Sequence, residues 1–130
     1  MNDRAGEVGH IRLAEDGPVG FGKAGSFEGF CSGGGIARQA IVRAEAALKA
    51  GQSPVFCPTA ADLPNITTQA VAEAANSGDS LALEIFNTVA RRLGQGLSIL
   101  IDILNPECII IGSIYLRQKS LLETTMRAVL

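Results

Sequence analysis

The segment Asp79–Gly112, DSLALEIFNTVARRLGQGLSILIDILNPECIIIG, carries the clearest structural signals of the chain. Apolar side chains recur every three or four residues over positions 85–104, which predicts a long amphipathic helix. Asp79 is a favourable N-cap, and the Asn-Pro pair at 105–106 ends the helix because the residue before proline disfavours helical geometry. The β-branched run Cys108–Gly112 predicts a strand buried on both faces, as parallel strands are. These signals indicate an α/β fold that is mostly helical with one clear buried strand.

Further helices are predicted on both sides of this segment. Residues 36–50, IARQAIVRAEAALKA, combine good helix formers with apolar faces, and Gly51 ends the pattern. Thr67 or Thr68 can cap a short helix that the NSGD sequence then breaks. Residues 118–129 have the composition of a last helix.

Two regions lack a helical pattern. Residues 51–65 contain three prolines and predict an ordered loop. Residues 1–35 are rich in turn formers and predict at most one short strand, at His10–Leu13. The sequence therefore offers almost no neighbours for a strand at 108–112, although a parallel strand requires them. We expect the missing strands to lie outside this chain, which would be part of a larger α/β domain.

The composition excludes several classes of protein. The chain has 130 residues, is 47% apolar and has a formal net charge of −2, which is typical of one globular domain rather than of a disordered segment. It has no basic stripe that would indicate nucleic-acid binding. Three widely spaced cysteines, Cys31, Cys57 and Cys108, predict free thiols in a reducing compartment. Because there is no signal-peptide pattern and charges interrupt the apolar stretch 81–104, we expect a cytoplasmic protein without membrane attachment.

The glycine-rich segment 5–35 contains the one histidine of the chain, His10, and allows four interpretations. A nucleotide P-loop is the first, because GPVGFGKA matches the pattern until Ala24 replaces the hydroxyl that would hold magnesium. Its context also differs, since GSFEGF is a poor first turn of a helix. A metal site is the second, but His10 has only the lone thiol of Cys31 as a nearby soft ligand.

The other two interpretations concern the carboxylates around His10. Glu7 and His10 stand three residues apart, a spacing that is common for an ordinary surface pair, and Glu28 alone would be a solvated charge. Alternatively, these three side chains could surround a polyol. A carboxylate accepts hydrogen bonds from neighbouring hydroxyl groups, a neutral imidazole both donates and accepts, and glycine lets the backbone approach a ligand.

Four motifs, taken together, resemble the ROK family, which contains bacterial sugar kinases and sugar-responsive repressors. The resemblance extends over nearly the whole chain and implies part of the C-terminal lobe of an actin-like (ribonuclease-H-like) ATPase fold for residues 1–130. The motifs occur in the family's order and spacing as AGEVGH (5–10), GxxGSFE (22–28), SGGGIA (32–37) and LNPECIIIG (104–112).

The resemblance also implies a function and a set of site residues. By it, Glu7, His10 and Glu28 are ligands of hexose hydroxyl groups, and Gly112 and Ser113 lie beside the adenosine of ATP. The family pattern has a second glycine where this chain has Ser113. The intact protein would be a glucokinase-like enzyme that uses ATP and Mg2+ to phosphorylate a hexose or an N-acetylhexosamine.

The chain departs from the family pattern at the zinc site. Many members bind structural zinc through the histidine and three cysteines, and the matching positions here, with a one-residue deletion, are Val19, Phe21 and Ser26. Without the thiolates, the resemblance implies that zinc is absent. We expect Val19 and Phe21 to form a small apolar plug beside His10 instead.

The catalytic elements of the family are a second departure. Its kinases carry a phosphate-binding hairpin and a catalytic aspartate before the motif that begins at Ala5. No catalytic residue is therefore assigned, and this segment alone is expected not to turn over. The alternative is a sugar-sensing effector domain of a repressor, in which case DNA would be a partner of the intact protein. A third interpretation is a helical assembly module, since the apolar helix 80–104 could support the homo-oligomer that we expect.

Overall fold

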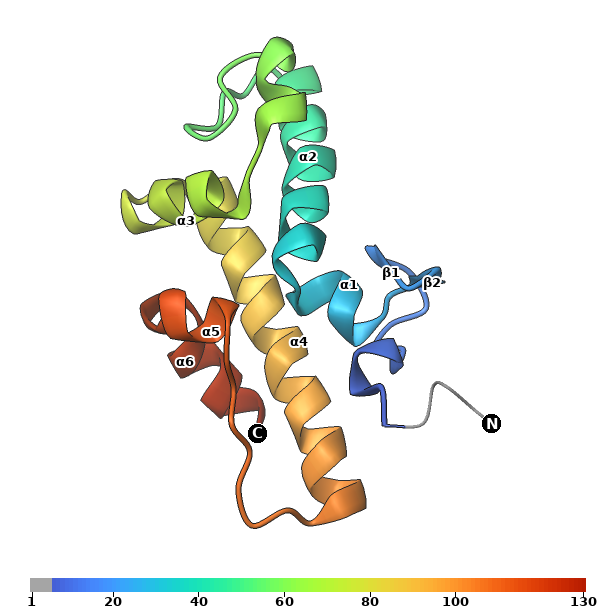
Figure 1. Cartoon of the computed structure of the whole chain (residues 1–130). Coiled ribbons are helices and arrows are strands. Elements are labelled where there is room, and N and C mark those ends of the chain that lie inside the picture. The colour runs from blue at the N-terminus through green and yellow to red at the C-terminus, as the bar shows by residue number, and fades with distance from the viewer. Residues whose placement is uncertain (1–5) are drawn as a thin grey trace.

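The long helix α4 (Ser80–Leu104) runs through the middle of the structure, and the other long helices pack along it (Figure 1). The computed structural model describes residues 6–130. Asp79 caps α4 by accepting a hydrogen bond at Oδ1 from the backbone N–H of Ala82 (2.8 Å), and Asn105 ends it in the left-handed conformation. Both predicted ends of this helix are confirmed. None of the helices in the described part of the chain has the length and apolar character that crossing a membrane requires.

The helix α2 (Gly33–Lys49) confirms the prediction for residues 36–50 and begins three residues earlier. The early start follows from Ser32, whose Oγ accepts a hydrogen bond from the backbone N–H of Gly35 (3.0 Å). An N-cap serine satisfies one of the free N–H groups at a helix start, so the turn of glycines is helical despite its low propensity.

The predicted helix near residue 68 and the last helix are also confirmed. Helix α3 (Thr68–Asn76) is capped by Thr67, whose Oγ1 accepts a hydrogen bond from the backbone N–H of Ala70 (3.1 Å). Helix α6 (Lys119–Val129) follows a single turn, α5 (Ile114–Arg117), and packs lengthwise on α4 (Figure 1).

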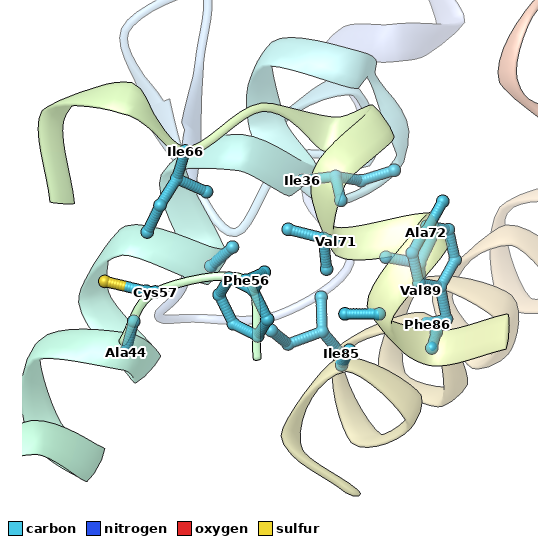
Figure 2. Packing of buried hydrophobic residues seen from close by; sticks show 14 of the residues in the cluster. Ile36, Ala44, Phe56, Cys57, Ile66, Val71, Ala72, Ile85, Phe86 and Val89 are labelled. Carbon is cyan, nitrogen blue, oxygen red and sulfur yellow. The ribbon is translucent and has the colours of Figure 1, made fainter. Parts of the chain in front are cut away.

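The larger of two core clusters joins α2, α3 and α4 to the loop before α3 (Figure 2). Ile85 and Phe86 of α4 are 0% and 1% exposed, and burying side chains of this size contributes roughly 2–3 kcal/mol each. A smaller cluster lies further along α4, where it holds α1 (Phe27–Cys31) and α6 against the long helix. Its buried members are Leu13, Phe27, Leu93, Leu97 and Met126.

The prediction of a buried strand at 108–112 is wrong for this chain. These residues form neither helix nor strand, and the side chain of Ile110 is 92% exposed. In residues 6–130 the only sheet is a two-stranded hairpin of β1 (Val19–Gly20) and β2 (Lys23–Ala24). A strand requires a neighbour to complete its hydrogen bonds, and this hairpin is too short to supply one.

Three expectations for the loops are also corrected. Residues 8–10 form a 3-10 turn, η1 (Val8–His10), and Arg12 makes a single bridge to Ser26, so the predicted strand at His10–Leu13 does not form. The GSFEGF sequence does begin a helix, α1. The proline-rich loop contains a second 3-10 turn, η2 (Ala60–Asn65), whose N-cap residue, Thr59, donates a hydrogen bond from its backbone N–H to the carboxylate of Asp62 (3.0 Å).

Candidate functional site

Helix α1 holds Glu28, and a buried serine fixes its start. Ser26 is 0% exposed; its Oγ accepts a hydrogen bond from the backbone N–H of Gly29 (3.1 Å) and donates one to the carbonyl of Gly20 (3.3 Å). The backbone N–H of Phe27 donates to the carbonyl of Ile11 (2.8 Å). A five-residue helix has little intrinsic stability, so these contacts determine where the Glu28 side chain lies.

Close backbone packing explains part of the glycine-rich segment. A Cβ atom on Gly29 would overlap the carbonyl of Pro18, and one on Gly35 would overlap the carbonyl of Gly29. Glycine at these positions allows the loop before α1, the helix α1 and the start of α2 to meet backbone to backbone. The segment therefore forms a closely packed support for the helix that carries Glu28.

Glu28 lines a cavity of about 360 Å³ together with the turn at Gly112 and Ser113. Gly9 is part of the same wall, and a Cβ placed on it would lie 3.2 Å from the Cβ of Glu28. This volume lies within the range of small-molecule sites. Three of the five residues predicted for binding therefore lie around one cavity, although they come from opposite ends of the chain.

The other two predicted residues, Glu7 and His10, do not line this cavity. Glu7 is exposed and directly precedes η1. His10 packs against Phe21, with ring centroids 4.2 Å apart and planes inclined by 46°. Its Nε2 atom is buried and has no hydrogen-bond partner among the described residues. Buried polar atoms normally have a hydrogen-bond partner, so this nitrogen could still donate or accept one hydrogen bond.

The positions that would carry zinc in many relatives do not fit a metal. Ser26 is engaged in two backbone hydrogen bonds, and Val19 and Phe21 offer no donor atom. Within residues 6–130, no group of three or more histidine, cysteine, aspartate or glutamate side chains could hold a metal ion. Of the expected apolar plug, Phe21 contacts His10, whereas Val19 is 49% exposed and lines a separate groove beside α2.

The P-loop interpretation is wrong. The GPVGFGKA sequence forms the β1–β2 hairpin rather than a loop between a strand and a helix. The Nζ of Lys23 donates a hydrogen bond to the backbone carbonyl of His10 (3.2 Å). The lysine therefore ties the hairpin to η1.

Cys31 lines the same cavity as Glu28. Burial raises the pKa of its thiol to about 12, an effect that the nearby Arg92 partly offsets. The thiol donates a weak hydrogen bond to the carbonyl of Val89 (3.8 Å). A thiol with this pKa is not a nucleophile near neutral pH, so Cys31 shapes the wall of the cavity.

A second cavity of about 320 Å³ adjoins the first. The two share Gly33, Ser113 and Ile114, and the second extends along α3. The Oγ1 of Thr68 donates a hydrogen bond to the carbonyl of Gly33 (2.5 Å), which fixes α3 against the start of α2. Sequence reasoning missed Gly33 and Gly9 as wall residues; their glycine-rich setting was the one available signal.

Comparisons with known proteins identify the family. The model of the ROK family matches residues 1–130. The chain is 34% identical over 117 residues to a glucokinase of Halalkalibacterium halodurans, and 34% identical over 116 residues to the DNA-binding transcriptional dual regulator NagC of Escherichia coli. These alignments cover 86% and 85% of the chain.

A solved structure is similar as well. The ROK family glucokinase of Streptomyces griseus, in complex with glucose and AMPPNP, matches 96% of the chain with a TM-score of 0.75 and 31% identity. The chain spans only part of these proteins: 33% of the glucokinase of H. halodurans, 25% of NagC and 40% of the S. griseus chain. The family match over the full sequence nevertheless shows that this chain belongs to the ROK family.

Proposed function

We propose that the chain is part of the C-terminal lobe of an ATP-dependent hexose or N-acetylhexosamine kinase, to which it contributes sugar- and nucleotide-binding residues. The observation that carries this proposal is the cavity where Glu28 meets the turn of Gly112 and Ser113. One residue comes from a motif expected to bind sugar and the other two from a motif expected to bind nucleotide. Phosphoryl transfer requires both ligands to bind in one site with the γ-phosphate directed at the sugar, so adjoining sugar and nucleotide residues support this proposal.

The sugar would lie in the cavity beside Glu28. The carboxylate of Glu28 is half-buried and accepts hydrogen bonds only, so it suits two neighbouring hydroxyl groups of a pyranose. His10 and Glu7 lie outside the cavity wall, so they would contact the sugar only if it extends beyond the cavity and reaches the exposed Glu7 and the unpaired Nε2 of His10, which is buried here. A sugar that lacks one of these hydroxyl groups would leave a polar side chain without a partner, which is the physical basis of selectivity.

The nucleotide would bind at the turn of Gly112 and Ser113. This turn borders both cavities, so a nucleotide placed in the second one would reach toward the sugar in the first. Ser113 adopts a positive φ of 52°, and Gly112 leaves open space where a Cβ would be. Mg2+ would neutralise the phosphate charge during transfer, and no side chain here is assigned to it. We expect these 130 residues alone to bind ligands but not to turn over.

The test is Glu28→Ala in the intact protein that carries this chain, in a coupled assay over a panel of hexoses and N-acetylhexosamines. Losing a charged hydrogen-bond acceptor should raise the apparent KM for sugar by roughly 10- to 100-fold and leave the KM for ATP nearly unchanged. Glu45→Ala is the matched control, because Glu45 lies exposed on α2 and pairs with Lys49 (2.8 Å). Equal changes in both KM values for Glu28→Ala would exclude Glu28 as a sugar ligand.

The second candidate is a sugar-sensing effector domain of a transcriptional repressor. It rests on the similarity to NagC, which equals the similarity to the glucokinase of H. halodurans. The same sugar panel separates the two functions. A kinase phosphorylates the sugar that it binds, whereas an effector domain binds it without consuming ATP and changes the affinity of the intact protein for DNA.

A further inference from the structure

Phe21 is an unusual residue for its position in the hairpin. It is the first of the two residues that join β1 to β2, and both residues of this turn have positive φ, 49° for Phe21 and 71° for Gly22. Such two-residue turns favour asparagine, aspartate or glycine, because a Cβ is strained in the left-handed region. A phenylalanine here is expected to destabilise the turn by about 1 kcal/mol.

Burial does not explain this phenylalanine. Its side chain is 71% exposed, so most of its apolar surface gains nothing from folding. Among residues 6–130, the aromatic contact of this ring is with His10, 4.2 Å between centroids. Strained residues cluster at functional sites, so an exposed one with no core contact motivates a hypothesis of function.

The contact with Phe21 is one of two that hold His10 against the hairpin. Lys23, two residues further on, donates from Nζ to the backbone carbonyl of His10 (3.2 Å). The hairpin thus holds the histidine by its ring and by its main chain. With the ring held, its buried Nε2 remains unpaired within the described residues.

We propose that Phe21 is a positioning residue, which holds the imidazole of His10 in the orientation that binds the sugar. The inference rests on the proposed role of His10 as a sugar ligand. An aromatic contact fixes the plane of the imidazole and leaves both ring nitrogens free, whereas a metal would occupy one of them. The hairpin therefore holds the imidazole with a buried, unpaired Nε2, and a sugar hydroxyl that reaches this nitrogen would complete its hydrogen bonding.

Phe21→Asn separates this role from a structural one. Asparagine suits the turn better than phenylalanine, so the melting temperature should stay equal or rise. The dissociation constant for the sugar, measured by titration calorimetry with glucose and with N-acetylglucosamine, should nevertheless increase about two- to tenfold, the value of one aromatic contact. Phe21→Tyr keeps the ring and should restore the affinity. Val19→Asn, in the same hairpin but away from His10, should leave it unchanged.

The imidazole itself gives a second measurement. At one fixed pH, the His10 ring protons should shift in the NMR spectrum when Phe21 is replaced by asparagine, because the neighbouring aromatic ring is lost, and not when it is replaced by tyrosine. The loss of signals in His10→Gln assigns these protons. Unchanged His10 signals or unchanged sugar affinity in Phe21→Asn would overturn the proposal, as would a fall in melting temperature with no change in affinity.

The role of His10 as a sugar ligand and the role of Phe21 in positioning it can be tested separately. If His10→Gln leaves the sugar affinity unchanged, His10 is not a sugar ligand, and its part in the proposed function fails together with the role of Phe21. If His10→Gln weakens binding and Phe21→Asn does not, only the positioning role of Phe21 is wrong.

Discussion

Burial divides the three cysteines into two reactivity classes. The pKa of the Cys31 thiol is raised to about 12 by burial, and that of Cys57 is raised by burial and by the nearby Asp62. Cys108 is exposed. Because the thiolate is the reactive species, a raised pKa leaves Cys31 and Cys57 protonated at neutral pH and up to their raised values.

We predict that one thiol per folded chain reacts rapidly with Ellman's reagent at about pH 8, and that it belongs to Cys108. Cys108→Ser should remove the fast phase, whereas Cys31→Ser should leave it intact. All three cysteines should react in denaturant. The measurement is the absorbance of the released thionitrobenzoate over time. A fast phase that survives Cys108→Ser and is lost when Cys31→Ser is added would mean that the cavity beside Glu28 opens to the reagent.

The site residues were predictable from the sequence only as members of motifs. Single residues such as Glu28 have no pattern that distinguishes a ligand from a solvated charge, so their assignment came from the family resemblance. The contact of Gly9 with Glu28, and the sharing of Gly33 by two cavities, could not be predicted. They depend on packing between segments that are distant in the sequence.

At the scale of elements, caps and periodicity predicted the long helices. Helices α2, α3 and α4 have a serine, threonine or aspartate N-cap and repeated apolar faces, both of which are local signals. Helix α1 was missed because its five residues include a glycine, and its stability comes from the buried rings of Phe27 and Phe30. The strand at 108–112 was wrong because β propensity cannot form a strand without a neighbour.

The carboxylate of Asp79 connects the start of α4 to the loop before α3, and replacing Asp79 tests how much this connection stabilises the fold. One carboxylate oxygen accepts from the backbone N–H of Ala82 (2.8 Å) and the other from that of Val55 (2.8 Å). We expect Asp79→Ala to lower the free energy of unfolding by about 1–3 kcal/mol, because it removes a helix cap and frees the loop. Asp79→Asn keeps one acceptor and should have an intermediate effect.

Chemical denaturation measures this effect. Asp102→Ala is the control, since Asp102 is exposed near the C-terminus of the same helix, where a negative charge is slightly unfavourable. It should change stability by less than about 0.5 kcal/mol. An Asp79→Ala variant as stable as this control would show that the cap and the loop contact contribute nothing to the fold.

At the scale of the whole molecule, the apolar surface is unevenly distributed. Exposed aliphatic side chains gather at the end of α4 and in the segment that follows it, where Ile103 is 71%, Leu104 63% and Ile110 92% exposed. Monomeric soluble proteins rarely expose contiguous apolar patches larger than a few hundred Å². Residues 108–112, which were predicted to be buried, contribute to this exposed apolar surface instead.

We predict that this surface drives self-association of the 130-residue chain. Ile110→Lys should shift the population toward monomer in sedimentation velocity runs over a range of concentrations, because a charge opposes burial of the patch. The melting temperature should not change, since Ile110 lies outside the core. Val55→Lys is the matched control: Val55 is 66% exposed but lies in the loop before α3, so it should associate as the wild type does. If both variants associate equally, another surface makes the contact between the chains.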